Sequence, residues 1–312
     1  MLRTGIFKIS QLKNKQLKDL FGKEKNISIK LYHDIKTDSS IVNTIYNKYS
    51  EIILNRFNTK SNAIKRTYRN RFNAFDVNCI KKIEEASFEN VKIHDLAISD
   101  GRASCFFLEN AINSFQKLNY TGSDIAMYYY LYSKPNEKNC YVITQENGVI
   151  IEITQAPFVW NMARKEGKLY FINNWLKSYY LKKCTNLLKS GALNAPEKIH
   201  ITDKEFSQLI QSNSNFSLKN YNLFEADTAT YNVIRVMNIL HFGYFSEDQL
   251  QLIFNNIYNS LEENGLLIEG SNEDAGSEVE GAIYKKTKNG FVLMLSGEKK
   301  SRIEKSVLNF KP

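Results

Sequence analysis

From residue 91 onwards, short apolar runs alternate with amphipathic stretches, which is the pattern of an alternating strand and helix fold. Residues 91–97 form a short apolar run that ends at a turn through Gly101. Residues 103–118 carry apolar side chains at three- and four-residue steps, which predicts a helix, and residues 120–125 form a second strand. A strand, a helix and a strand in this order predict two parallel strands joined by a right-handed crossover.

The same alternation returns near the C-terminus. Residues 231–237 read as a strand, Ser246 caps a helix that runs through Leu261, and residues 266–270 read as the next strand. Two final runs, at 282–286 and 291–295, flank Asn289-Gly290 and predict an antiparallel hairpin. The fold class expected is therefore α/β, with a mostly parallel sheet, helices on both faces and a C-terminal antiparallel hairpin.

The remaining segments divide the chain into candidate domains. Apolar stripes in residues 1–90, at 17–21, 41–53 and 72–83, have a helical period and predict a helical N-terminal segment. The middle of the chain is less regular, with a hairpin around Asn147-Gly148 and a helix from about 169 to 188. We therefore expect a helical segment at 1–90 and an α/β domain at 91–312, with an insert at about 127–219.

The net charge of +9 is concentrated in the N-terminal segment. Residues 1–90 contain 18 Lys and Arg against 9 Asp and Glu, whereas the rest of the chain is neutral. Two interpretations stay open, a solvated helical surface and an anionic partner such as nucleic acid, a membrane surface or an acidic protein. The densest basic stretch, 65–71, has a single aromatic residue, unlike a base-stacking platform.

Composition restricts the class of protein further. Hydrophobic residues make up 43% of the 312 residues and charged residues 24%, which excludes wholesale disorder. The four cysteines form no Cys-x-x-Cys pair, so we expect no metal site and a reducing compartment. A polar N-terminus and the lack of an apolar run of about 20 residues predict a cytoplasmic protein without a membrane span.

Candidate ligand-binding residues lie where the predicted strands end, because open parallel sheets bind ligands beyond the carboxyl ends of their strands. The small side chains of Ala97, Ser99 and Gly101 let a ligand approach the backbone after the first strand. The next helix begins close by, and its N-terminal amides suit a carboxylate. Asp124 ends the second strand at the spacing expected of an acid that binds a ribose diol. A plain nucleotide-binding Rossmann domain is the main alternative explanation of these features.

Five segments, in order, resemble motifs of the class I methyltransferases. Residues 95–101 resemble the first motif and are closest to its Ala-Cys-Ser-x-Gly version in the chemotaxis-receptor enzymes, with Ile98 in place of the cysteine. Residues 121–125 resemble the second motif. Residues 221–224 are similar to the Asn-Leu pair beside the cofactor, 238–246 to the fourth-strand loop, and 260–268 to the turn before the fifth strand. A plain nucleotide-binding domain does not predict the block from 238 to 268.

This resemblance implies a Rossmann-like domain that binds S-adenosyl-L-methionine and transfers its methyl group. The residues it places at the cofactor are Asp95, Ala97, Ser99, Gly101, Asp124, Ile125, Asn222, Leu223 and Asn238. His241 and Tyr244 lie in the fourth-strand loop and are the candidate catalytic residues. Since the sulfonium already carries the activation, the protein mainly aligns the reactants, and the acceptor, a protein or a small molecule, is not encoded in a motif.

Departures from the family define two alternatives. Met237 stands where the chemotaxis-type enzymes carry an arginine, and residues 1–90 do not match their N-terminal domain, so their glutamyl substrate is not carried over. The missing glycines favour a non-catalytic adaptor, which Asp124 and Asn238 oppose. A nucleic-acid methyltransferase guided by the basic segment is the other alternative, although no Asn/Asp-Pro-Pro-Tyr motif of amino-methylating DNA enzymes follows the fourth strand.

Overall fold

The computed structural model describes residues 4–13, 26–38, 40, 46, 49–50, 69–164, 170–272 and 278–312. The chain forms two compact units, one of residues 1–66 and 128–201 and the other of residues 67–127 and 202–312. This division does not follow the boundary expected at residue 90. The apolar stripe predicted at 17–21 and most of the stripe at 41–53 lie outside the described residues.

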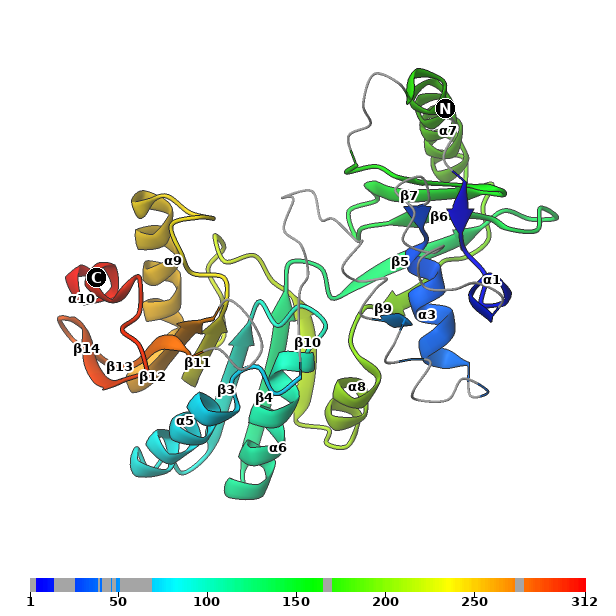
Figure 1. Ribbon diagram of the computed structural model, residues 1–312. Helices are drawn as coiled ribbons and strands as arrows, with labels where there is room; N and C mark the ends of the chain where they lie inside the picture. Colours follow the sequence, from blue (N-terminus) through cyan, green and yellow to red (C-terminus); the bar gives the residue numbers. More distant parts are fainter. Residues whose placement is uncertain are drawn as a thin grey trace. The chain divides into compact units, whose positions relative to one another are not determined.

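Among the described residues of the second unit, seven strands form one sheet in the order β10-β4-β3-β11-β12-β13-β14 (Figure 1). Their bounds are β3 Val91–Leu96, β4 Leu118–Asp124, β10 Phe216–Asn220, β11 Tyr231–Met237, β12 Leu261–Ser271, β13 Glu280–Thr287 and β14 Gly290–Ser296. The first five are parallel, and β13 runs antiparallel to both neighbours.

The parallel strands, counted along the chain, lie in the order 3-2-1-4-5. This is the doubly wound arrangement, in which the direction of winding reverses beside the first strand, here between β3 and β11. The expected α/β class with a mostly parallel sheet is confirmed. The closing hairpin consists of β13 and β14, with Gly290 at a φ of 118° in its turn.

Helices cover both faces of this sheet. Alternate residues of a strand point to opposite faces, so His94 and Asp95 of β3 lie on different faces of the sheet. On one face lie α5 (Asn73–Glu85) and α6 (Cys105–Ser114), which contact each other. On the other lies α9 (Glu247–Ser260), followed by the short α10 (Glu304–Asn309). The apolar core beneath α9 includes Ile234, Val236, Leu250, Ile253, Phe254 and Leu267.

Local signals predicted α9 better than α6. Ser246 caps α9 in a reciprocal capping box with Gln249, as the sequence indicated. The helix expected at 103–118 is shorter, because a 3-10 turn (η1, Arg102–Ser104) precedes α6 and the backbone is extended from Phe115. Leu118 already belongs to β4, where it is buried.

The first unit contains an antiparallel sheet in the order β8-β7-β6-β5-β9 within the part of the chain that the structure describes. The strands are β5 Tyr128–Ser133, β6 Cys140–Thr144, β7 Ile150–Gln155, β8 Phe158–Asn161 and β9 Glu197–His200. Helix α7 (Phe171–Lys189) packs against this sheet through Cys184 and Tyr180, which lie beside Trp160. The hairpin predicted around Asn147-Gly148 is the β6–β7 connection.

The described N-terminal residues are not wholly helical. They include helices α1 (Ser10–Lys13) and α3 (Ile29–Thr37), but also the parallel pair β1 (Gly5–Ile6) and β2 (Asn26–Ile27). A Cβ on Gly5 would lie 2.1 Å from a methyl group of Val159, so this glycine lets β1 pack closely on β8. Two-residue strands carry no periodicity, which is why the sequence pattern missed them.

No described helix is long and apolar enough to cross a membrane. The four cysteines are buried and free, as expected of small core residues. In the described part of the chain, no three His, Cys, Asp or Glu side chains are grouped as a metal site would require.

A buried arginine lies at the centre of the second unit. Arg235 on β11 is 1% exposed, and its guanidinium lies 2.9 Å from Asp76 Oδ1 of α5 and 3.1 Å from Asp95 Oδ1 of β3. Tyr120 of β4 donates a hydrogen bond to Asp95 at 2.9 Å, and the Phe107 ring lies 4.7 Å from the guanidinium. Burial raises the pKa of Asp76 to about 6 even beside Arg235.

Replacing this arginine should destabilise the fold strongly. Arg235→Met leaves Asp76 and Asp95 buried without their cation, and breaking a buried pair in this way costs about 3–5 kcal/mol of unfolding free energy. Urea unfolding at pH 7 measures the loss, which should shrink at pH 5, where protonation relieves the unpaired carboxylates. The control is Lys299→Met, which removes an exposed ion pair with Glu278 and should cost at most about 1 kcal/mol. Equal stability of the two variants would contradict the role given to Arg235.

Candidate functional site

The loop that follows β3 has an unusual backbone. Ala97, Ser99 and Gly101 have φ angles of 56°, 59° and 85°, all in the left-handed region that glycine favours. A residue with a side chain reaches this region at a cost of about 1–2 kcal/mol. These are the three positions at which the first methyltransferase motif carries glycine. The loop thus keeps a glycine-type conformation although two of the glycines are replaced.

Asp124 holds this loop in place. Its carboxylate accepts a hydrogen bond from the Ser99 N–H at 2.9 Å and another from the Ala126 N–H at 3.3 Å. The residue ends β4 and is 9% exposed, so the carboxylate lies at the rim of the sheet rather than in solvent. A carboxylate oxygen can accept more than one hydrogen bond, which is the chemistry that recognition of a diol requires.

The two ends of the loop differ in what surrounds them. The Ser99 hydroxyl is buried and has no hydrogen-bond partner among the described residues. A Cβ on Gly101, by contrast, would lie 2.1 Å from the ring of Phe206 on α8 (Lys204–Gln211). Gly101 therefore makes room for α8, and the expectation that it opens the backbone to a ligand does not fit this packing. The orphaned Ser99 hydroxyl leaves that part of the loop suited to a polar ligand.

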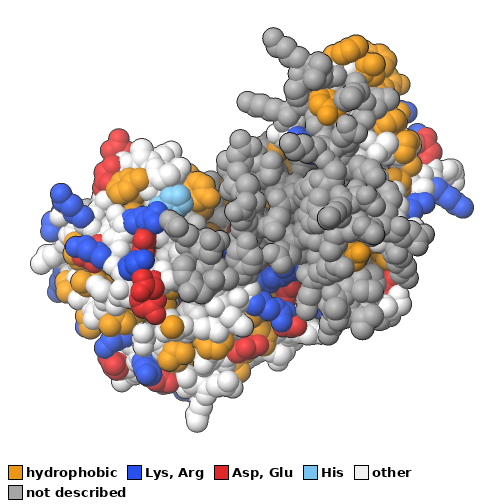
Figure 2. All heavy atoms as spheres, viewed as in Figure 1, with side chains coloured by type: hydrophobic (Ala, Val, Ile, Leu, Met, Phe, Trp, Pro, Cys, Tyr) orange, Lys and Arg blue, Asp and Glu red, His pale blue; other side chains and the backbone are white. Residues whose placement is uncertain are grey.

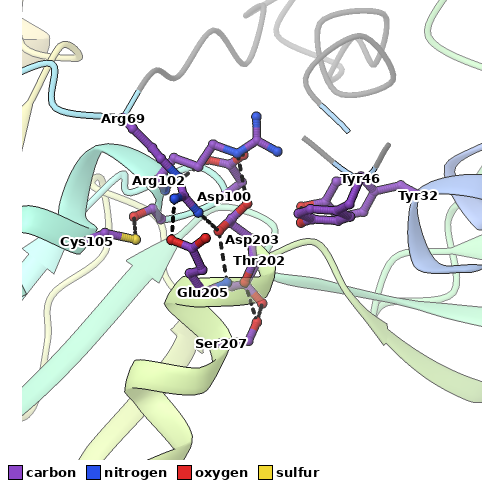
Figure 3. Close-up of polar contacts among 11 residues, drawn as sticks. Tyr32, Tyr46, Arg69, Asp100, Arg102, Cys105, Thr202, Asp203, Glu205 and Ser207 are labelled. Atoms are coloured by element: carbon purple, nitrogen blue, oxygen red, sulfur yellow. Dashed lines mark hydrogen bonds and ion pairs between the residues drawn. The ribbon is translucent and has the colours of Figure 1, made fainter. Parts of the chain in front are cut away.

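An ionic cluster that the sequence did not reveal supports the loop from α8 (Figure 3). Asp203 caps α8, lies 2.9 Å from Arg102 Nε and 3.3 Å from Arg69 Nη2, and donates its N–H to the carbonyl of Asp100. Arg69 also pairs with Glu205. Burial disfavours the charged form of Asp203. The neighbouring Arg102 and Arg69 nevertheless hold the pKa of this carboxylate below its ordinary value. Asp203 thereby holds the loop at Asp100 and Arg102, whereas Asp124 holds it at Ser99.

This cluster changes the interpretation of the basic stretch 65–71. Arg69 is paired with acids, and Arg71 is buried and donates hydrogen bonds to the side chain and carbonyl of Asn272 at 2.5 and 2.7 Å. Both arginines thus have roles within the second unit. Residues 65–68 lie outside the described residues. An anionic partner for the N-terminal segment stays a prediction, with two fewer cations to support it.

Asp95, expected beside the cofactor, points into the interior. Both of its carboxylate oxygens lie 3.1 Å from Arg235 Nη1, and the residue is 1% exposed. It fixes the end of β3 from the face covered by α5 and α6. Its contacts in this structure are those of the buried ionic core, two residues before the loop begins at Ala97.

The connection from β10 to β11 brings the predicted Asn222 and Leu223 to the same edge. Asn222 Oδ1 accepts a hydrogen bond from the Phe224 N–H at 3.2 Å, and Leu223 packs on the core beneath α9. Phe224 is 37% exposed, and its ring lies 5.7 Å from that of Phe245. Ile125, which follows Asp124, is 59% exposed. Exposed apolar side chains thus follow the ends of both β4 and its neighbour β10.

A buried histidine fastens this connection to the sheet. His94 Nδ1 lies 3.4 Å from Asp227 Oδ2, and His94 Nε2 lies 2.9 Å from the hydroxyl of Ser123. Asp227 also pairs with Lys219 and accepts a hydrogen bond from the Tyr231 hydroxyl. Burial and the neighbouring Lys219 lower the pKa of His94 to about 3, so the imidazole is neutral. His94 is a core residue with polar partners.

The loop after β11 holds the two candidate catalytic residues. Asn238 has a φ of 59°, and its side-chain oxygen accepts a hydrogen bond from the Asn272 N–H at 3.0 Å. His241 and Tyr244 have ring centroids 4.2 Å apart, and His241 Nδ1 accepts a hydrogen bond from the Gly243 N–H. Burial and Arg302 lower the pKa of His241, so the neutral ring carries its proton on Nε2. His241 is arranged as a hydrogen-bond donor.

These loops share one edge of the sheet, because parallel strands β3, β4, β10 and β11 all end there. The exposed apolar side chains of the edge are Ile125, Phe224, Phe242 and Tyr244. A carboxylate, an orphaned hydroxyl and exposed rings suit a ligand that combines a polyol with a flat apolar group. The structure thus brings most of the predicted residues to one rim and turns Asp95 inward.

No protein-family model matches this chain, and no curated protein sequence does. Solved structures that resemble it include the N-methyltransferase NodS from Bradyrhizobium japonicum WM9, bound to S-adenosyl-L-homocysteine, at 11% identity and a TM-score of 0.32. The match covers 64% of this chain and 62% of NodS. CalS10, an amino pentose methyltransferase from Micromonospora echinaspora with bound S-adenosylmethionine, matches at 8% identity and a TM-score of 0.32, over 70% of this chain and 65% of CalS10.

A methyltransferase from Clostridium acetobutylicum matches at 11% identity and a TM-score of 0.33, over 84% of both chains. The chain spans less than two thirds of the length of NodS and CalS10.

The neutral state of His94 generates a pH prediction. Its pKa is about 3 in the folded protein and about 6.5 when unfolded, so only the unfolded chain takes up a proton as the pH falls below 6.5. The His94 contribution to stability is therefore complete above pH 6.5. It should decline by up to about 2 kcal/mol between pH 6.5 and 5. Urea unfolding across this range measures the slope, which His94→Gln should flatten. Identical slopes for the parent and His94→Gln would contradict a neutral buried His94.

Proposed function

We propose that this chain binds S-adenosyl-L-methionine at the carboxyl edge of β3, β4, β10 and β11 and transfers its methyl group to a protein or small-molecule acceptor. The observation that carries the proposal is the loop at 97–101, which keeps three left-handed residues and is hydrogen-bonded through Ser99 to Asp124. This contact links the two segments, 95–101 and 121–125, that resemble the first and second motifs of class I methyltransferases.

The residues at the rim fit the parts of such a cofactor. Asp124 would accept hydrogen bonds from the ribose hydroxyls, and the buried Ser99 hydroxyl would gain the partner that it lacks. Ile125 and Leu223 would lie against the adenine ring. Asn222 and Asn238 would act indirectly, by stabilising the conformation of their loops, because their side-chain oxygens accept hydrogen bonds from backbone N–H groups.

The cofactor, when bound, supplies an activated methyl group, so the chain's own residues need to orient the acceptor and exclude water. Tyr244 is 49% exposed beside His241 and offers the acceptor a hydroxyl. His241 presents its Nε2–H as a donor while Gly243 occupies Nδ1. To accept a proton at Nδ1, the imidazole must first give up this bond. We therefore assign His241 to positioning the acceptor and Tyr244 to contact with it.

A non-catalytic adaptor is the second candidate, favoured by the packing of Phe206 against Gly101. The Phe206 ring of α8 fills the space beside Gly101, so that end of the loop is covered. Asp124 and Ser99 have no evident use in an adaptor beyond holding the loop, so cofactor binding separates the two functions. We also propose a cytoplasmic location, since four free buried thiols suit a reducing compartment.

Substitution of Asp124 tests the proposal. Hydrogen bonds to charged groups contribute about 1.5–3 kcal/mol each, so Asp124→Ala should weaken S-adenosyl-L-homocysteine binding by about tenfold or more. Asp124→Asn retains one acceptor oxygen and should lose less. Isothermal titration calorimetry measures the affinities after circular dichroism has confirmed folding.

The matched control is Asp248→Ala, which removes an exposed carboxylate from the first turn of α9 and should leave the affinity unchanged. If the parent protein shows no binding heat and no thermal shift, the adaptor is favoured. If Asp124→Ala folds and binds as tightly as the parent, the role assigned to Asp124 is wrong.

A further inference from the structure

Helix α7 of the first unit exposes a row of large apolar side chains. Phe171 and Trp175 are 68% and 66% exposed, and Tyr179 and Ile172 are 52% and 41% exposed. Phe171, Trp175 and Tyr179 recur at four-residue steps and therefore lie on one face of the helix. Figure 2 shows hydrophobic side chains gathered over this helix. Side chains of this size are seldom left in water without a partner.

The opposite face of α7 is already used, so the exposed row is not the packing face of the helix. Cys184 and Tyr180 pack beside Trp160, and Asn173 accepts a hydrogen bond from the Trp160 indole. Lys177 donates hydrogen bonds to the carbonyl oxygens of three residues between 161 and 164. These contacts fasten the helix to the sheet and leave the apolar row facing outward.

Positive charge continues this exposed face toward the C-terminal end of α7. Lys182, Lys183 and Lys189 are exposed, and the 19 residues of the helix include no Asp or Glu. Since neighbours on a helix recur at three and four residues, Lys182 follows Tyr179 and Lys183 lies beside it. The face thus has an aromatic half and a cationic half, and no acid on the helix neutralises it.

We propose that α7 docks the first unit onto an anionic lipid surface. Trp, Tyr and Phe favour the interfacial region of a bilayer, where an apolar ring and a polar tip are both satisfied. Lysines beside them attract the negative headgroups of the cytoplasmic leaflet. The exposed face of α7 then lies against the interface, with its aromatic rings at the level of the headgroups and its lysines beside the anionic groups.

Single-stranded nucleic acid is also anionic and would be attracted by the lysines, but it fits the aromatic half of the face less well. Base stacking needs free ring faces. The Trp175 and Tyr179 rings instead stack on each other, with their centroids 6.2 Å apart and an angle of 18° between the ring planes. Ile172 has no face for a base to stack on, yet it is well placed to enter a lipid interface. The observations therefore favour a lipid surface.

The test uses the full-length chain and vesicles of phosphatidylcholine with or without phosphatidylserine. Cosedimentation should show binding to the serine-containing vesicles, weakened by salt. Tryptophan fluorescence reports the contact directly. The chain has two tryptophans, and Trp160 is 1% exposed, so a blue shift on binding arises from Trp175.

Paired variants separate the two halves of the face. Phe171→Ser with Trp175→Ser should weaken binding at least tenfold, and Lys182→Glu with Lys183→Glu should abolish the preference for anionic vesicles. The control, Val292→Ser with Met294→Ser, removes exposed apolar side chains from β14 and should bind as the parent does. All three proteins should keep the parent's circular dichroism spectrum, since the substituted side chains are exposed.

Three results would overturn the proposal: no binding to anionic vesicles at low salt, equal loss of binding in the β14 control, or tight binding of a single-stranded RNA that vesicles do not displace. S-adenosyl-L-homocysteine affinity is measured on the same variants. It should not change, so failure of this proposal and failure of the proposed function are distinguishable.

Discussion

The burial of Arg235 is the constraint on which the second unit depends. A guanidinium in the interior must be matched by charge and hydrogen bonds, and here α5 and β3 each supply one carboxylate. Because Tyr120 of β4 binds the same Asp95, the network joins a helix and three adjacent strands. Alternation along β3 then places His94 on the opposite face. The ionic core thereby fixes the register of the central strand and the point at which the loop at 97–101 leaves the sheet.

The loop itself depends on hydrogen bonds from two directions. Asp124 binds the Ser99 N–H from β4, and Asp203 binds the Asp100 carbonyl and the Arg102 side chain from α8. Left-handed conformations at Ala97 and Ser99 persist because the surrounding contacts compensate for their cost. Two substituted glycines are thus compatible with a glycine-type loop.

Local patterns predicted the parts of the fold that depend on local physics. The strands at 231–237 and 266–270, the cap at Ser246 and the closing hairpin all follow from periodicity and turn chemistry. The arginine between Ile234 and Val236 in an apolar run is a signal of buried acids nearby that the sequence analysis did not use, since it placed Asp95 at the cofactor instead. Packing between Gly101 and Phe206 had no such signal, since the two residues meet only after folding. The grouping of residues 1–66 with 128–201 also depends on contacts between residues that are far apart in the sequence. Local patterns therefore could not predict it, and the structure does not have the boundary expected at residue 90.

The interleaved order of the chain has a consequence for synthesis on the ribosome. Strands β3 and β4 emerge first, but their remaining neighbours, β11 and β10, both follow residue 201. When every segment of the first unit has been synthesised, the central sheet therefore still consists of β3 and β4 alone, and the outer edge of each strand is unpaired. An isolated pair of strands is at best marginally stable in water. Long-range pairings also form slowly, so the nascent chain carries two unprotected strand edges for the time needed to translate the whole insert.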